Sequence, residues 1–483
     1  MARDCLNFID GAERAPASGR WLDNLEPATG AVLGRVADSG PEDVARAVAA
    51  ARAAQADWAA LPTAERAGLL RELARHIGEQ AESLARLESA DTGKPLALAR
   101  NVDMARARAN LEFFAGAVEH WSGQSHDMGA AGFNYTRSHP LGVVACITPW
   151  NLPLYLLTWK IGPALAAGNA VVAKPSEMTP SSASALAQLA LEAGFPPGVL
   201  NIVHGAGATA GQALVDHPDV QGISFTGGTV TGRRLASEAA GRLQRLSLEL
   251  GGRNPAVVFE DVDPAQVADG LVRAGFTNQG QVCLCSSRIL IHENAYEAVR
   301  EALVERVQAL KPGDPLDETT DQGALISAAH LEKVSGYIDQ ARADGGRILC
   351  GGRRTSPGGR CEKGWFLEPA VIEGLPEDSR VLSEEIFGPV VTLQSFSTGG
   401  QAIERANLTP YGLAATVWTG DLDRAHRVAG AIQAGIVWVN GWLVRDLRTP
   451  FGGMKASGIG REGGFRSLEF FTETQNVCIV HNP

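Results

Sequence analysis

From about residue 140 onward, short apolar runs alternate with amphipathic stretches of helical periodicity. Helical stretches of about 10–16 residues separate the apolar runs, and this alternation is typical of a parallel sheet with helices on its faces. A second series begins at Pro255 and continues to about residue 450. The pattern therefore predicts an α/β fold built from two such units. The apolar runs of the first series lie at 142–147, 170–173, 199–203, 220–225 and 246–250.

The first ~120 residues are predicted to be mostly helical. Ser39 supplies a hydroxyl at a helix cap, and Pro41 suits the first turn that follows. Two alanine-rich amphipathic helices are expected at about 42–59 and 63–90. The segment 123–138 is polar and contains glycine between two ordered regions, so it is predicted to form a hairpin that projects from the body.

Composition narrows the classes of function. The net charge of −11 leaves no basic surplus for phosphates, which argues against a nucleic-acid partner. Seven scattered cysteines are not a disulfide framework. No His-Glu-x-x-His or Cys-x-x-Cys pattern occurs, so no metal site is expected. The N-terminus lacks a signal pattern and no apolar run reaches the ~20 residues of a membrane span, so a cytoplasmic protein is expected.

Polar and glycine residues follow every apolar run of the first series. In an open α/β sheet, ligands bind outside the carboxyl ends of the strands. Five such ends therefore predict one site at a single edge of the sheet. The segments that follow the runs are 149–151, 174–177, 205–207, 226–229 and 249–252.

Two segments carry candidate catalytic groups. Cys283 follows a short polar turn that contains glycine, and Glu249 precedes two glycines at a predicted strand end. A thiol and a carboxylate in such surroundings indicate covalent catalysis with a separate general base. Alone, Cys283 fits a buried structural thiol better. Asn151, between two prolines, fits either a turn asparagine or a donor to an oxyanion.

Three further segments suit a dinucleotide. The segment 205–210 fits a G-x-G-x-x-A pattern, but it follows the third run and lacks the acidic residue ~20 positions later, so it is interpreted as a tight turn. Residues 226–229 open a helix whose N–H groups suit a diphosphate, although a plain turn also fits. Lys174 and Glu177 are either loop charges or a ribose site, and a carboxylate there would favour NAD over NADP.

Taken together, these segments resemble the aldehyde dehydrogenases of the large NAD(P)-dependent superfamily. The matching motifs run in family order from about Asn7 to Cys478. The resemblance predicts an open parallel-sheet cofactor domain, a second α/β catalytic domain and a small β oligomerisation hairpin. The motifs are 148–153, 172–177, 225–228, 248–255, 278–283, 384–389 and 450–458.

The resemblance also implies roles for individual residues. Cys283 would be the nucleophile, Asn151 and the backbone N–H of Cys283 the oxyanion hole, and Glu249 the general base. Because Glu249 would activate a water molecule, the product would be a free acid. The residues implied in NAD binding are Trp150, Lys174, Glu177, Gly207, Gly227, Gly228, Leu250, Glu385 and Phe387.

The resemblance further implies a division of the chain. Residues 1–121 and 141–250 would form the NAD-binding domain, and 251–452 the catalytic domain. Residues 122–140 and 465–483 would form the oligomerisation segments, in which the hairpin pairs with the C-terminal strand. The chain would assemble as a homodimer or homotetramer.

The segments 278–287 and 440–448 look most like the branch that acts on 2-aminomuconic and 2-hydroxymuconic semialdehydes, which are ring-cleavage products carrying a carboxylate. An arginine fork binds a carboxylate bidentately, so Arg445 is the first candidate and Arg106 the second. Arg106 fits a helix-surface charge equally well. The alternatives are another aldehyde specificity, such as succinic semialdehyde or aromatic aldehydes, and a non-catalytic protein on the same scaffold.

Overall fold

The computed structural model describes residues 4–481, and within them the predicted α/β fold class is confirmed. The first sheet has the order β2-β1-β9-β8-β7-β10-β11-β23, and its five central strands are parallel. These five correspond to the five apolar runs predicted. In sheet order, the bounds are β2 (Ala12–Arg14), β1 (Asn7–Ile9), β9 (Leu200–Ile202), β8 (Ala170–Lys174), β7 (Val143–Ile147), β10 (Val220–Thr226), β11 (Arg245–Glu249) and β23 (Gly458–Ile459).

The strand order of this sheet reverses beside β7. The chain leaves β7 for β8 and β9 on one side, and it returns to the other side of β7 with β10 and β11. A crevice forms at the carboxyl ends of strands where the order reverses in this way. The segments after β7 and β10 therefore meet at this crevice.

Both faces of the first sheet are buried. Val144 and Cys146 of β7 pack into one core with the helices α2, α5, α6 and α7, while Val143 and Ala145 pack into a second core with α1, α8 and α9. This explains why the runs are apolar throughout instead of alternating. The helices are α1 (Pro41–Ala60), α2 (Thr63–Glu79), α5 (Ala105–Glu119), α6 (Pro153–Ala166), α7 (Ser181–Glu192), α8 (Gln212–Asp216) and α9 (Thr229–Ala240).

The first ~120 residues are mostly helical as predicted, and α1 matches the helix expected at about 42–59. Four strands between Asn7 and Ala37 were not predicted: β1 and β2 extend the first sheet, and β3 (Trp21–Leu25) pairs with β4 (Val32–Ala37). The helix expected at 63–90 is two helices, since the chain bends at Gln80 and α3 (Ala81–Thr92) follows. Gln80 carries no helix-breaking signal in the sequence.

The cap predicted at Ser39 was also wrong. Gly40 is the N-cap of α1, and its N–H donates to the Asp43 carboxylate at 3.3 Å. The hydroxyl of Ser39 instead exchanges hydrogen bonds with the Asn7 amide, at 2.7 and 3.0 Å. The buried amide of Asn7 thus takes the hydroxyl away from the helix end.

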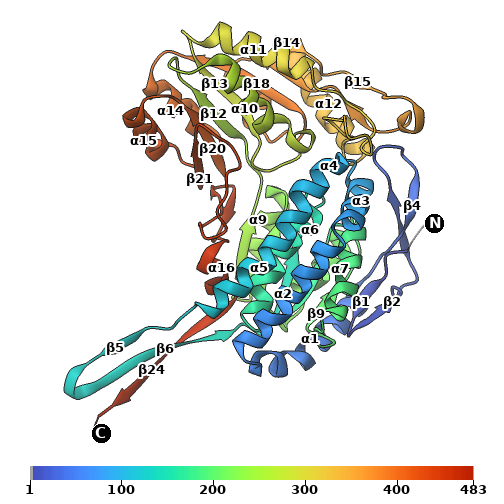
Figure 1. The fold of residues 1–483 in the computed structure, drawn as a ribbon, viewed down its shortest axis with the longest axis vertical. Helices are drawn as coiled ribbons and strands as arrows, with labels where there is room; N and C mark the ends of the chain where they lie inside the picture. Colours follow the sequence, from blue (N-terminus) through green and yellow to red (C-terminus); the bar gives the residue numbers. More distant parts are fainter. Residues whose placement is uncertain (1–3, 482–483) are drawn as a thin grey trace.

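The second sheet has the order β14-β17-β18-β13-β12-β20-β21 and is parallel except at β14. Figure 1 shows it in the upper part of the molecule with its flanking helices. The strands are β14 (Arg347–Cys350), β17 (Ala370–Glu373), β18 (Val390–Phe396), β13 (Ser286–His292), β12 (Asn254–Val258), β20 (Ala414–Trp418) and β21 (Ile436–Val439). The helices are α10 (Pro264–Phe276), α11 (Tyr296–Gln308), α12 (Ala328–Ala343), α14 (Gly399–Asn407) and α15 (Leu422–Ala431).

A small antiparallel sheet projects from the body (Figure 1). It contains β5 (Ser125–Asp127), β6 (Gly132–Pro140) and β24 (Thr472–Val480), and β24 pairs with β6 along its whole length. The polar segment 123–138 predicts the hairpin, and the family resemblance implies this pairing. The ends of the predicted segments, residues 1–3 and 482–483, lie outside the described residues. Between residues 4 and 481, no helix is long and apolar enough to cross a membrane.

Candidate active site

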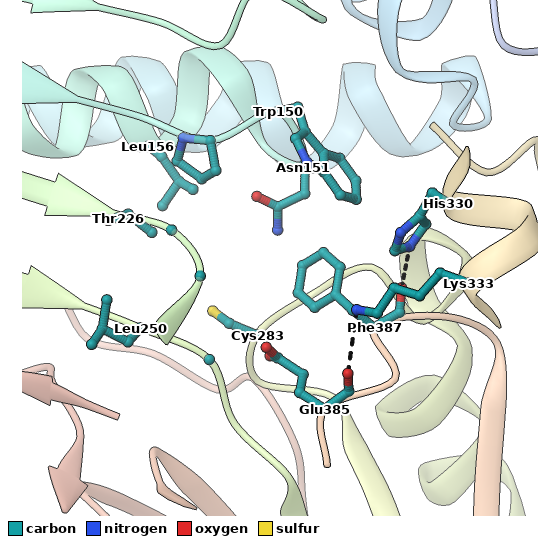
Figure 2. Close-up of a pocket in the computed structure, with 14 residues that line it drawn as sticks. Trp150, Asn151, Leu156, Thr226, Leu250, Cys283, His330, Lys333, Glu385 and Phe387 are labelled. Atoms are coloured by element: carbon teal, nitrogen blue, oxygen red, sulfur yellow. Dashed lines mark hydrogen bonds between the residues drawn. The ribbon is translucent and has the colours of Figure 1, made fainter. Parts of the chain in front are cut away.

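Cys283 and Asn151 extend toward each other across a cavity at the crevice (Figure 2). Cys283 follows the short helical turn η4 (Thr277–Gly280), and Asn151 lies between β7 and α6. The Asn151 amide nitrogen donates one hydrogen bond, at 2.9 Å, to the carbonyl of Gln281. An amide nitrogen has two hydrogens, so the second can donate to a ligand beside the thiol.

The surroundings of Cys283 hold its thiol in the neutral form. Burial raises the pKa of Cys283, and the charges of Glu385 and Glu249 raise that pKa further. Arg445 acts in the opposite direction. A cation beside the thiol would therefore increase the thiolate fraction, and the thiolate is the nucleophile.

Glu249 ends β11 and is only 3% exposed. Neither of its carboxylate oxygens has a hydrogen-bond partner among the described residues. Burial raises the pKa of Glu249 well above its usual value, the charge of Glu462 raises that pKa further, and Lys160 lowers it. Glu249 and Cys283 line one cavity, which places a base of raised pKa beside the thiol.

A cleft along the first sheet contains the residues predicted to bind the adenosine half of a dinucleotide. Lys174 ends β8, and its ammonium nitrogen lies 3.3 Å from a Glu177 carboxylate oxygen. Gly228 caps α9, and a side-chain carbon added at Gly228 or Gly207 would meet only open space. The backbone N–H groups at the start of α9 are therefore open to an anionic ligand.

The remaining predicted cofactor residues line the adjoining cavity with Cys283 (Figure 2). Trp150, Gly227 and Gly228 line both cavities, so the two spaces form a continuous path to the thiol. One carboxylate oxygen of Glu385 accepts a hydrogen bond from the Gly252 N–H at 2.9 Å. Of the residues predicted to bind the cofactor, those that line this cavity are Trp150, Gly227, Gly228, Leu250, Glu385 and Phe387.

Sequence reasoning missed His330 and Lys333, which also line this cavity. The imidazole of His330 bonds the Phe387 carbonyl at 2.7 Å and packs edge-on against Trp150. Burial lowers the pKa of His330 to about 4, so the ring is neutral and donates this bond. Both residues are on the first turns of α12, where their spacing is that of an ordinary surface helix.

Arg445 and Arg106 converge on one atom, the phenol oxygen of Tyr155. Arg445 donates to it at 3.0 Å and Arg106 at 3.3 Å. Tyr155 and Arg445 line the cavity that contains Cys283 and Glu249, whereas Arg106 is absent from its described lining and reaches it through Tyr155. Tyr155 was missed by sequence reasoning, because a tyrosine inside an apolar helix is usually a core residue.

One nitrogen of the Arg445 guanidinium is unpaired within residues 4–481. Its Nη2 is buried and has no hydrogen-bond partner among the described residues. The guanidinium also lies over the rings of Trp159 and Phe451, at 5.0 and 4.2 Å from their centres. Cys283 lines both cavities: it shares one with the Asn151 amide, and the other with the Glu249 carboxylate and the Arg445 guanidinium. This arrangement suits covalent attack on the carbonyl of an acidic molecule.

Comparisons with known proteins agree with this class of chemistry. The aldehyde dehydrogenase family matches residues 14–477. A 2-aminomuconic semialdehyde dehydrogenase of Danio rerio is 49% identical, with 98% of each chain covered. A 2-hydroxymuconic semialdehyde dehydrogenase of Pseudomonas sp. (strain CF600) is 43% identical, with 99% of each chain covered. An NAD+ complex structure of an aldehyde dehydrogenase from Bacillus cereus has a TM-score of 0.96 and 40% identity, covering 99% of this chain and 97% of that one.

The chain belongs to the aldehyde dehydrogenase family. It is an enzyme that oxidises an aldehyde, and the resemblance seen in the sequence is confirmed over nearly the whole chain.

Proposed function

We propose that the chain oxidises 2-aminomuconic or 2-hydroxymuconic 6-semialdehyde to the dicarboxylic acid, with NAD as the electron acceptor. The observation that carries the choice of substrate is Arg445, which lines the cavity that also contains Cys283 and whose buried Nη2 has no hydrogen-bond partner among the described residues. A buried guanidinium donor without a partner is unfavourable, and a substrate carboxylate would satisfy it.

The second arginine and the shape of the cavity support the same substrate. Arg106 adds positive charge behind Tyr155, so a carboxylate in the cavity would meet the Arg445 guanidinium and the Tyr155 phenol, with the Arg106 guanidinium bonded to the far side of that phenol oxygen. The walls between Arg445 and Cys283 are mostly apolar and include Leu443 and Phe451. Such walls suit the conjugated chain that separates the carboxylate of a muconic semialdehyde from its aldehyde.

The described residues fit NAD. In this proposal Lys174 and Glu177 hold the ribose of the adenosine half, and Gly207, Gly227, Gly228 and Trp150 approach the diphosphate. Leu250, Glu385 and Phe387 contact the nicotinamide half. NAD, when bound, supplies the hydride acceptor and a positively charged ring. The open space at Gly207 and Gly228 supports this assignment, as does the start of α9, where no side chain among the described residues bonds the first N–H groups of the helix.

Different residues of the chain carry out the separate steps of the reaction. The thiolate of Cys283 attacks the aldehyde carbon and forms a thiohemiacetal, whose oxyanion accepts hydrogen bonds from the Asn151 amide and the Cys283 N–H. After oxidation, the acyl group remains on sulfur as a thioester. Glu249 removes a proton from water, and the resulting hydroxide releases the free acid and returns the thiolate.

The projecting sheet supports an assembly of identical chains. β24 is an edge strand, and an open edge is a surface on which another chain can pair. In this proposal the segments 122–140 and 465–483 join subunits in a homodimer or homotetramer, and the two larger units are the NAD-binding and catalytic domains. The cytoplasmic location remains a prediction from the sequence.

A panel of aldehydes tests the choice of substrate. The enzyme is incubated with NAD and each muconic semialdehyde, succinic semialdehyde or benzaldehyde, and NADH is followed by absorbance. The highest kcat/KM is expected for a muconic semialdehyde. A higher value for either other aldehyde would contradict the substrate assignment, and no turnover of any aldehyde would contradict the enzymatic function itself.

A further inference from the structure

The backbone carbonyl of Asn151 is held by two buried side chains. The ammonium nitrogen of Lys94 donates to it at 2.9 Å, and the amide nitrogen of Asn278 donates to it at 3.1 Å. Lys94 is 0% exposed and Asn278 is 3% exposed. The first helical bond of α6 runs from the Leu156 N–H to the Leu152 carbonyl, so Asn151 lies just outside the helix. The hydrogen bonds of the helix therefore do not fix the Asn151 carbonyl.

The lysine is itself fixed by surrounding carboxylates. Asp103, also 0% exposed, forms an ion pair with Lys94, and Glu88 lies 3.8 Å away. Asp103 is on the π-helical turn η1 (Ala99–Met104), an uncommon conformation that is frequent at functional sites. An ammonium removed from water is expensive unless it is paired and hydrogen-bonded, so an apolar residue would be the simpler choice for stability alone.

Asn278 also adopts an unusual conformation. Its φ is +53° and that of Gln279 is +55°, so two consecutive residues other than glycine are left-handed. Such strain persists only where the surroundings enforce it, and it is common at active sites. Here the strained turn places the Asn278 amide on the Asn151 carbonyl and leads directly into Cys283.

We infer that Lys94 and Asn278 are positioning residues that clamp the Asn151 carbonyl and so aim the Asn151 amide at the oxyanion. The inference rests on the proposed function, in which Asn151 is an oxyanion donor. Lys94 and Asn278 hold the backbone carbonyl of Asn151, and the Gln281 carbonyl holds its side-chain amide. Asn151 is therefore fixed at both its backbone and its side chain. Donors of this kind act only when they are oriented before the charge develops.

The variants Lys94→Met and Asn278→Gly each remove one arm of the clamp. Glycine at 278 keeps the positive φ without strain, so the variant removes the amide, which also donates to the Gln281 carbonyl at 3.3 Å and lines the cavity that contains Cys283. Gln279→Gly is the matched control, because it relieves the same strain and removes a buried amide that donates to the Ala324 carbonyl instead, at 2.9 Å. NAD affinity is measured by fluorescence to show that the cofactor site is intact.

Two reactions of the Cys283 thiol distinguish a role in orienting the Asn151 amide from a general structural role. Oxidation of the aldehyde passes through an oxyanion, whereas alkylation of Cys283 by iodoacetamide, followed on its peptide by mass spectrometry, does not. Lys94→Met and Asn278→Gly should lower kcat/KM by about tenfold or more and change alkylation by less than about twofold, because a small misplacement of an oxyanion donor costs up to about a hundredfold. Gln279→Gly should change neither rate by more than about twofold.

Double variants with Asn151→Ala complete the test. If the clamp acts through Asn151, adding Lys94→Met or Asn278→Gly to Asn151→Ala should lower kcat/KM no further. Additive losses, or equal losses in oxidation and alkylation, would overturn the positioning role of Lys94 and Asn278 and leave the oxyanion role of Asn151 standing. Full activity of Asn151→Ala would overturn the proposed oxyanion role and the clamp with it. If Lys94→Met does not fold, the pair Asn278→Gly and Gln279→Gly decides the question.

Discussion

The carboxylate of Glu462 raises the pKa of Glu249, and both side chains line the cavity that contains Cys283. Glu462 also accepts hydrogen bonds from Lys160 at 2.7 Å and from the Ser224 hydroxyl at 3.1 Å. Two carboxylates thus face one small buried space. The base is therefore less easily ionised than an isolated glutamate would be.

This arrangement predicts how activity depends on pH. Only the ionised forms of Glu249 and Cys283 act, and both groups have raised pKa values, so kcat/KM should rise with pH into the alkaline range. Glu462→Gln removes a negative neighbour and should lower the pKa of Glu249. The pH profile of deacylation should then move to lower pH. The exposed Glu297→Gln serves as the control. An unchanged profile, or one moved to higher pH, would contradict the coupling.

Glu249→Gln should slow hydrolysis of the thioester much more than formation of NADH. The amide keeps the size of the side chain but cannot accept a proton from water. A burst of NADH and an acyl-enzyme visible by mass spectrometry are the expected results. Equal slowing of acylation and deacylation would show that Glu249 is not the deacylation base.

Cys283→Ala should abolish oxidation and leave NAD affinity intact, because the thiolate forms the covalent bond and does not hold the cofactor. Cys285→Ala is a close control, since this thiol lies two residues away and is buried. Turnover is followed by NADH absorbance, and NAD affinity by protein fluorescence. More than trace activity in Cys283→Ala would remove the nucleophile assignment.

Arg445→Ala should remove a charge-assisted pair worth about 1.5–3 kcal/mol, and the loss should fall mainly on the KM of substrates that carry a carboxylate. An uncharged aldehyde of similar length never makes this contact, so its kinetics should change little. Steady-state kinetics with both substrates make the comparison. Similar losses for both would mean that Arg445 has a structural role.

Arg106→Ala should give a smaller effect of the same kind, because Arg106 acts through Tyr155. The double variant Arg106→Ala/Arg445→Ala should be non-additive if both guanidinium groups serve one carboxylate. Strictly additive losses in kcat/KM would show that the two arginines act independently.

Glu177 should make the enzyme prefer NAD over NADP, since a carboxylate at the ribose repels a 2′-phosphate. Glu177→Gln should weaken that preference, with the change seen chiefly in the KM for NADP. Turnover is compared at limiting concentrations of each cofactor. Equal use of both by the unaltered enzyme would contradict the role given to Glu177.

The sequence predicts the parallel strands well because each is a continuous apolar run that ends in polar or glycine residues. It fails near the N-terminus, where β1 and β2 are three residues each and depend on pairing with a distant strand. The break at Gln80 has no local signal either. Elements that depend on tertiary contacts, not on their own pattern, are the ones that sequence reasoning misses.

The residues of the candidate site also fall into two groups, those with a local signal in the sequence and those that only tertiary contacts bring to the site. Cys283, Glu249 and Asn151 each lie within three residues of a glycine or proline, which marks them as unusual in the sequence. Tyr155 and His330 are on helices with ordinary spacing, and only the packing of other elements brings them to the cavity. The sequence likewise does not show that Arg445 lines the cavity while Arg106 lies behind Tyr155, because this depends on three-dimensional contacts.

The strand that presents Glu249 is paired on one side by the end of the chain. β11 pairs with β23 as its antiparallel neighbour, with Glu249 opposite Gly458, and Lys160 of α6 forms its ion pair with Glu462. During synthesis, the segment that carries Arg445, Gly458 and Glu462 follows Cys283 by more than 160 residues. The thiol and the base are thus both made well before the guanidinium and the second carboxylate whose charges shift their pKa values.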